Sequence, residues 1–438
     1  MRTLISKPKL LADWGEEYEE RAAEWWELFL DLVFVAAASN TADSLKEDLS
    51  WHGLLAFFLL FSFFYSGWSF YTFHQTRYYG NSMYHLALLY FYIIGTAGMV
   101  VNSAGFEYME GFSVAALIQR IVLILMYLDA YIAIPRARIQ CRAEIGTLVV
   151  SCVCLFSSIF VKNKTFSIGV WIISAFSENV AYALFSFFGF FRSHLVPLNI
   201  DHCAERMGCL LMVILGESVI SGVISGRNIE LKSHRLAYYV AMMLTILMAF
   251  SFGLIYYAVI PPRELHAYRR SVPHGIGFVW VHWALLSSLL AMGTGVKFVV
   301  SSLIHDEQPS IERGQVYLLF FSLAISMLCI VVLRALHFWG IQPTASDPPK
   351  IRRIKYFWWA VASVWCMIPV SLGLYFGESS TLVRPMVAMV ATVPCVLGYA
   401  MFETVLTHVL DTDGFGNIKP EGLQVDNTIR VNSYHAIK

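Results

Sequence analysis

The chain has 438 residues, of which 57% are hydrophobic and only 14% are charged. About a quarter of a typical soluble chain is charged, so this composition nearly excludes a soluble enzyme. The 31 basic residues balance the 31 acidic ones, so the chain has no net charge to attract nucleic acid, which is not an expected partner. Aromatic residues make up 15%, as in chains that meet lipid tails and headgroups. The expected partner is a lipid bilayer.

Windows of about 20 apolar residues, the length that crosses about 30 Å of hydrocarbon, predict an all-α polytopic bundle in one membrane domain, residues 25–410. We expect a short N-terminal segment, 1–24, and a C-terminal tail, 411–438, outside it. The twelve predicted spans are 25–44, 54–73, 84–103, 113–135, 145–162, 167–190, 207–225, 237–260, 275–301, 315–338, 356–376 and 385–409.

The distribution of Lys and Arg predicts the orientation of these spans. With a cytoplasmic N-terminus, the inner segments hold 20 of these residues and the outer loops hold 8. Both termini are therefore predicted to be cytoplasmic, and the plasma membrane is the favoured location. The largest inner contribution comes from 350–355, directly before Trp358 and Trp359, and we interpret this stretch as a headgroup belt.

Few features of the sequence indicate catalysis or a bound metal. The eight cysteines include no CxxC pair, and no two of the 13 histidines have the i,i+4 spacing of a helical metal site. A metal site would need His85, His202 and His282 from separate elements. Motifs of soluble hydrolases and phosphate-binding loops are absent as well. We expect no cofactor and no metal, and we lean against enzymatic activity.

Several ionisable residues fall inside the predicted spans, where each charge costs roughly 2.5 to 3.5 kcal/mol. Glu178 and Glu217 lie at about 16 Å depth on consecutive spans, which places both near the midplane. The others on this predicted path lie nearer one side of the membrane. Toward the cytoplasm they are Glu27, Asp31, Asp129, His282, Glu403 and His408, and toward the outside they are Arg120 and Lys297. One interpretation is a path for protons or cations. The other is a set of buried ion pairs, such as Asp31 or Glu178 with Arg120, that only fix helix packing.

Two stretches resemble a known family. Residues 27–35, ELFLDLVFV, and 202–218, HCAERMGCLLMVILGES, are similar to the signatures of the bacterial low temperature requirement A family. The stretch from Trp68 to Arg77 and the one from His282 to Lys297 also fit, whereas His85 lies where the family usually has acidic and basic residues. The matching residues are Glu27, Asp31, His202, Glu205, Arg206, Gly208, Gly216, Glu217 and Ser218. The resemblance implies a polytopic membrane protein without an established substrate.

The preferred functional hypothesis is a transporter or channel-like permease for a small ion or solute. In it Glu217 is the midplane proton or cation site, Glu178 is its neighbour and Asp31 lies at the cytoplasmic gate. Arg120 and Lys297 would pair with acids or attract an anionic substrate. The alternatives are a membrane-embedded enzyme or lipid-handling protein, with Glu217 and His282 as acid and base, and a structural or sensory protein.

The two motif stretches also predict an internal repeat. Glu27 opens the motif of the first span and Glu205 opens that of the seventh. Twelve spans divide into six plus six of the same orientation, as in some transporters built from parallel repeats.

Overall fold

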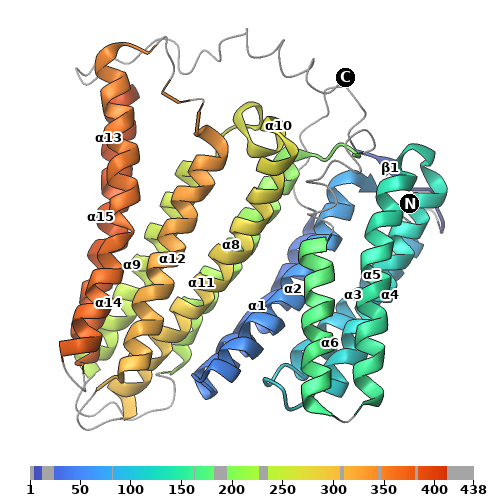
Figure 1. Cartoon of the computed structure of the whole chain (residues 1–438), viewed down its shortest axis with the longest axis horizontal. Helices are drawn as coiled ribbons and strands as arrows, with labels where there is room; N and C mark the ends of the chain where they lie inside the picture. Colours follow the sequence, from blue (N-terminus) through green and yellow to red (C-terminus); the bar gives the residue numbers. More distant parts are fainter. Residues whose placement is uncertain are drawn as a thin grey trace. The chain divides into compact units, whose positions relative to one another are not determined.

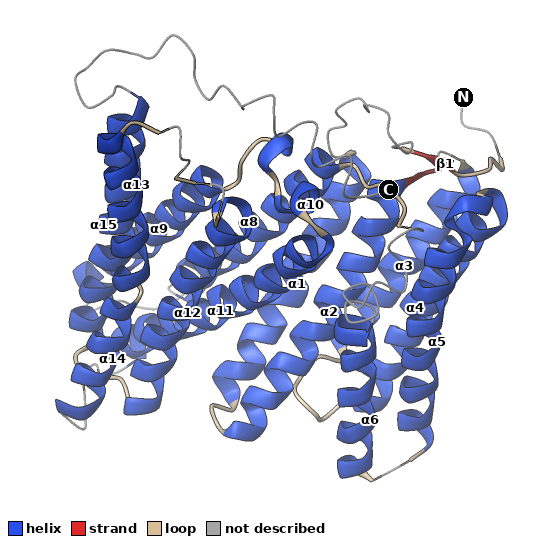
Figure 2. Ribbon diagram, turned by 45° about the horizontal axis from the view of Figure 1, so that its top comes forward, coloured by secondary structure: helices blue, strands red, loops and turns tan. Residues whose placement is uncertain are grey.

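The chain is almost entirely helical, and its only strands are the short pair β1 (Lys9–Leu10) and β2 (Tyr78–Tyr79) within the described residues (Figures 1 and 2). The computed structural model describes residues 4–11, 24–80, 82–161, 163–181, 195–225, 235–305, 310–340, 342–343, 347–379 and 383–411. Ten helices of this described part are long and apolar enough to cross a membrane. The prediction of an all-α polytopic membrane protein is confirmed.

Each predicted span coincides with a helix. The match is direct for nine helices, α1 (Trp25–Glu47), α2 (Trp51–Arg77), α3 (Met83–Val101), α4 (Met109–Ala133), α5 (Arg138–Phe160), α9 (Arg235–Val259), α11 (Val272–His305), α12 (Arg313–Phe338) and α15 (Pro385–Asp411).

The remaining three predicted spans differ in detail. The sixth begins as α6 (Lys164–Phe176) and continues into a π-helical turn, η2 (Ser177–Ala181), after which 182–190 lies outside the described residues. The seventh corresponds to α8 (Ile200–Ser225), and the eleventh is divided at Cys366 into α13 (Pro349–Trp365) and α14 (Met367–Ser379). Short helices join the long ones: η1 (Pro135–Ala137), η4 (Arg263–Leu265) and α10 (Ala267–Arg270).

The helices form two compact units, Met1–Glu217 and Ser218–Lys438. The boundary falls inside α8, so the motif stretch that opens α8 belongs to the first unit. The predicted segments 1–24 and 411–438 lie largely outside the described residues, so they stay predictions.

The first unit is arranged around α2, a helix that is apolar on nearly all its faces and mostly buried. An apolar helix without a polar face must be surrounded by other helices or by lipid, and α2 packs against α1, α4 and α6. Ser50 begins α2 by accepting a hydrogen bond from the Gly53 backbone N–H, which satisfies one of the free donors of the first turn.

The second unit contains α9, α11, α12, α13, α14 and α15, with α11 against α12 and α9 against α15. The small residues of α11 allow close packing. A Cβ added at Gly295 would lie 2.9 Å from the Leu319 Cα, and one added at Gly293 would lie 2.4 Å from the Ser218 Oγ. Gly293 and Gly295 therefore let α11 approach its neighbours closely.

Candidate functional site

Five side chains of the first unit form what we call the motif cluster: Glu27 and Asp31 on α1, Trp68 on α2, and His202 and Arg206 on α8. The Arg206 guanidinium donates two hydrogen bonds to the Asp31 carboxylate, at 2.6 and 2.8 Å. The Trp68 Nε1 donates to the same carboxylate at 3.0 Å, and its ring lies beneath the guanidinium, 5.6 Å away. Both oxygens of Asp31 are therefore occupied.

Glu27 and His202 form the second contact between an acid and a base in the cluster, one helical turn before Asp31 and Arg206. The Nε2 of His202 lies 3.0 Å from a Glu27 oxygen that also accepts the Glu24 backbone N–H. The i,i+4 spacings 27/31 and 202/206 place these side chains on one face of each helix. Two acid and base pairs therefore link α1 to α8 inside the unit, with every member at most 4% exposed.

Three polar atoms of the motif cluster are buried without a hydrogen-bond partner among the described residues: Glu27 Oε1, His202 Nδ1 and Arg206 Nε. Buried polar groups are nearly always hydrogen-bonded to protein or ordered water. The cluster therefore has capacity for a further polar partner at each of these atoms, which a pair that serves packing alone does not require.

Arg120 and Glu178 form a second, separate pair at the centre of the first unit. The Nε and one terminal nitrogen of Arg120 donate to the two Glu178 oxygens at 2.8 and 2.7 Å. Ser66 on α2 and Ser151 on α5 each donate to the same carboxylate at 2.5 Å, and Arg120 also bonds Gln119 and the Phe63 carbonyl.

Each nitrogen of the Arg120 guanidinium and each oxygen of the Glu178 carboxylate has a protein partner. Both side chains are 0% exposed, and Glu178 sits on the π-helical turn, an element that often occurs at functional sites. The interactions join α2, α4, α5 and the end of α6. Of the two partners considered for Arg120, the structure provides Glu178, and the geometry is that of a packing element.

Sequence reasoning missed an ion pair of the first unit. Arg77 at the end of α2 donates to Glu144 of α5 at 2.7 Å, and Gln140 donates to the same carboxylate at 3.0 Å. The i,i+4 spacing of Gln140 and Glu144 at the start of α5 was the available signal. The Nε2 of His85 lies 3.1 Å from an Asp129 oxygen, so a histidine and an acid are hydrogen-bonded in this region.

A further ion pair, also missed, lies in the second unit. Arg334 of α12 donates to Glu403 of α15 at 2.5 Å. Trp358 of α13 donates to the other Glu403 oxygen at 2.7 Å and lies 3.3 Å from the guanidinium. Arg334 and Glu403 fall in the predicted spans 315–338 and 385–409, but nothing in the sequence paired them.

The predicted path residues His282, Lys297 and Glu217 are also buried. His282 on α11 is fully buried, with its Nδ1 2.7 Å from the Phe278 carbonyl and its Nε2 2.8 Å from the Tyr256 hydroxyl. Lys297 on α11 is 5% exposed, and Glu217 and Ser218 on α8 are 2% and 1% exposed. Of the other motif residues, Glu205 is exposed, Gly208 is buried and Gly216 is intermediate.

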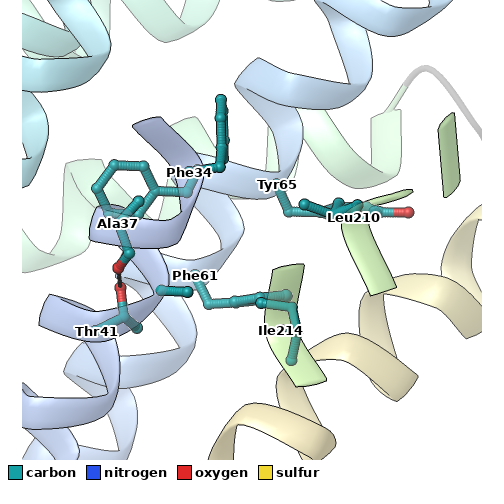
Figure 3. A pocket seen from close by; sticks show the side chains of 9 residues that line it. Phe34, Ala37, Thr41, Phe61, Tyr65, Leu210 and Ile214 are labelled. Carbon is teal, nitrogen blue, oxygen red and sulfur yellow. Dashed lines mark hydrogen bonds between the residues drawn. The ribbon is translucent and has the colours of Figure 1, made fainter. Parts of the chain in front are cut away.

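An apolar recess lies one helical turn from the motif cluster, between α1, α2 and α8 (Figure 3). Phe34 follows Asp31 by three residues, Leu210 follows Arg206 by four, and Tyr65 precedes Trp68 by three. The Thr41 hydroxyl in its wall donates to the Ala37 carbonyl at 2.7 Å, so the recess is apolar. No group of three or more potential metal ligands occurs among the described residues.

The long apolar helices and the buried charges within them define the class: this chain is a multi-pass integral membrane protein. The model of the bacterial low temperature requirement A protein family matches residues 22–409, so the chain belongs to that family. The matched region includes the motif cluster and both units. No curated protein and no solved structure matches the chain.

Proposed function

We propose that this protein is a transporter or channel-like permease for a small ion or solute, and that the motif cluster takes part in moving it. One observation carries the proposal: four ionisable side chains are buried between two helices of the first unit, while three of their polar atoms have no partner in the part of the chain that the structure describes. Charges in a bilayer are costly, so those that are retained are functional candidates by default.

The two pairs of the cluster support different roles. Asp31 is held by three donors, so it acts as a fixed counter-ion for Arg206. His202 keeps its Nε2 on Glu27 and has Nδ1 without a partner, so it can bind a proton at Nδ1 without losing that contact. The proposed exchange group is therefore the pair of Glu27 and His202.

Glu217 remains our proposed midplane proton or cation site, because it is a buried carboxyl on the same helix as His202 and Arg206. Glu178 has a different proposed role. Its saturated contacts with Arg120 suit a residue that positions helices and does not exchange protons.

A recurring pairing in both units supports the proposed internal repeat. Arg120 lies on the fourth long helix of the first half and pairs with Glu178 after the sixth. If α8 is counted as the first long helix of the second half, Arg334 lies on the fourth, α12, and pairs with Glu403 on the sixth, α15. Repeats of this kind are a common architecture of secondary transporters.

One alternative has a specific observation in its favour. The network of Arg120 and Glu178 is satisfied without any additional ligand, which is the expectation for a structural or sensory membrane protein whose charges only specify packing. That alternative predicts no flux from the purified chain.

The test is ion or proton flux in vesicles reconstituted with the full chain, measured across pH for the wild type and for Glu27→Gln, Glu217→Gln and His202→Gln. We expect each of the three to abolish the flux or shift its pH dependence. Glu110→Gln, at an exposed position in the first turn of α4, is the matched control and should leave it unchanged. Measurable flux that none of the three variants alters would refute the assignment.

A further inference from the structure

The first seven residues of α13 carry four cations, Lys350, Arg352, Arg353 and Lys355, and no acid. The N-terminal end of a helix has a partial positive charge, which favours acidic side chains and disfavours basic ones. The basic residues therefore weaken the start of their own helix. An anion bound beside this turn would remove that penalty.

The length of the span places these cations at the depth of lipid headgroups. The candidate span Pro349–Glu378 has 30 residues, which extend about 45 Å, whereas the hydrocarbon core is about 30 Å thick. Roughly ten residues must lie outside it. The cations are at the beginning of the span and are followed by Trp358 and Trp359, residues that prefer the interface. Lys350 to Lys355 then lie about 5 to 12 Å beyond Trp358 along the helix.

The basic side chains differ in what they contact within the described chain. Lys355 donates to both oxygens of Asp347, at 3.0 and 2.8 Å, so it joins the helix to the segment before it. The side chains of Arg352 and Arg353 form no hydrogen bond or ion pair with any residue that the structure describes, and Arg353 is exposed while Arg352 is half-buried. Two guanidinium groups at headgroup depth are thus available to an external ligand.

We propose that Lys350, Arg352 and Arg353 form a binding surface for the phosphate-bearing headgroups of anionic phospholipids. Juxtamembrane basic clusters attract anionic lipid, and the planar fork of Arg binds phosphate oxygens through paired hydrogen bonds. The ion pair between Asp347 and Lys355 holds the start of α13 at this depth. The proposal does not depend on transport.

The test compares lipid selectivity in reconstituted vesicles. The full chain is placed in phosphatidylcholine containing a trace of spin-labelled phosphatidylglycerol or spin-labelled phosphatidylcholine, and the fraction of immobilised label gives the relative association constant. We expect the wild type to prefer the anionic lipid. A basic residue near an anionic surface contributes about 1 kcal/mol, which is about fivefold in binding. Arg353→Gln should therefore lower the relative association constant for the anionic lipid about fivefold. R352Q/R353Q should lower it further.

Two controls separate this site from general attraction between charges. Arg313→Gln with Arg384→Gln removes two exposed cations from the opposite end of the second unit, at the starts of α12 and α15, and should leave the preference unchanged. R352K/R353K keeps the charge and should retain most of it. Equal preference for the two lipids in the wild type, a preference that survives R352Q/R353Q, or an equal loss in the control pair would each overturn the proposal.

Discussion

Arg120 and Glu178 face each other with two parallel hydrogen bonds, although 58 residues separate them in the chain. The pair contributes to stability only if both members are present, because a single charge left in a dry interior is far more costly than a satisfied pair. Four segments of the first unit depend on it.

Removing one member of this pair should therefore be severe. We expect Arg120→Met to lower the free energy of unfolding by about 3 to 5 kcal/mol, because Glu178 is then a buried carboxylate without its cation. Thermal unfolding of the detergent-solubilised chain is the measurement. R120M/E178M, which removes both charges, should recover a large part of that loss, and a double variant as unstable as the single one would contradict this account.

The contact between Arg206 and Asp31 depends on the planar geometry of the guanidinium and not only on its charge. Lysine carries a single nitrogen and cannot form two parallel bonds to Asp31 while lying over Trp68. We expect Arg206→Lys to cost about 1 to 3 kcal/mol and to lower the unfolding temperature. The comparison is Arg142→Lys on α5, where the side chain is exposed and bonds Tyr131. A similar small effect at both positions would show that the fork is unimportant.

Close packing of α11 on α12 makes Gly295 intolerant of a side chain. The Cβ of Gly295→Ala would lie 2.9 Å from the backbone of Leu319, and overpacking of this kind costs about 1 to 3 kcal/mol. Gly146→Ala is the matched control, because a Cβ there has no atom within 4 Å, so the variant should gain up to about 1 kcal/mol from helix propensity. The measurement is the unfolding temperature of each, and equal shifts would refute the packing argument.

Acid should weaken the second unit through His266, which lies outside the spans. Burial lowers the pKa of His266 from 6.5 to about 3, with a contribution from nearby His282. Its Nδ1 accepts the Tyr268 backbone N–H at 3.3 Å, and its ring packs against His337 and Phe278. The neutral form is therefore the folded form.

The unfolded chain binds this proton more tightly than the folded chain does. The free energy of unfolding therefore begins to decrease as pH falls below about 6.5, and it decreases further until about pH 3. Between pH 7.5 and 5 the loss from this group is about 2 kcal/mol. The test is to measure the free energy of unfolding of the wild type and of His266→Gln across this range. The decrease should be about 2 kcal/mol smaller for the variant than for the wild type. Parallel curves would show that His266 does not contribute.

Fold class was accessible from the sequence because a membrane span leaves a continuous apolar run, and each of the twelve predicted runs contains helix within the residues that the structure describes. The division of the eleventh span at Cys366 was not predicted, because residues 356–376 form one apolar run. Hydropathy measures how apolar a segment is and does not reveal a local interruption of its helix.

The ion pairs were harder to predict than the spans. The pair of Glu178 with Arg120 was one of two pairs predicted for that arginine. The partner of Asp31 is 175 residues away and was not predicted, because depth in the membrane does not give the rotation of each helix. Arg206 was identified only through the family motif. The pairing of Arg334 with Glu403 had no local signal at all, because it depends on how α12 and α15 pack.

Trp68 gives the motif cluster an optical reporter. Its indole N–H is bound to Asp31 and its ring lies under Arg206, so any change in the charge of that carboxylate alters the electric field across the fluorophore. The chain has 12 tryptophans, and the difference between the emission of the wild type and of Trp68→Phe isolates this one. Titrating that difference spectrum would follow the ionisation of a buried acid without any added dye.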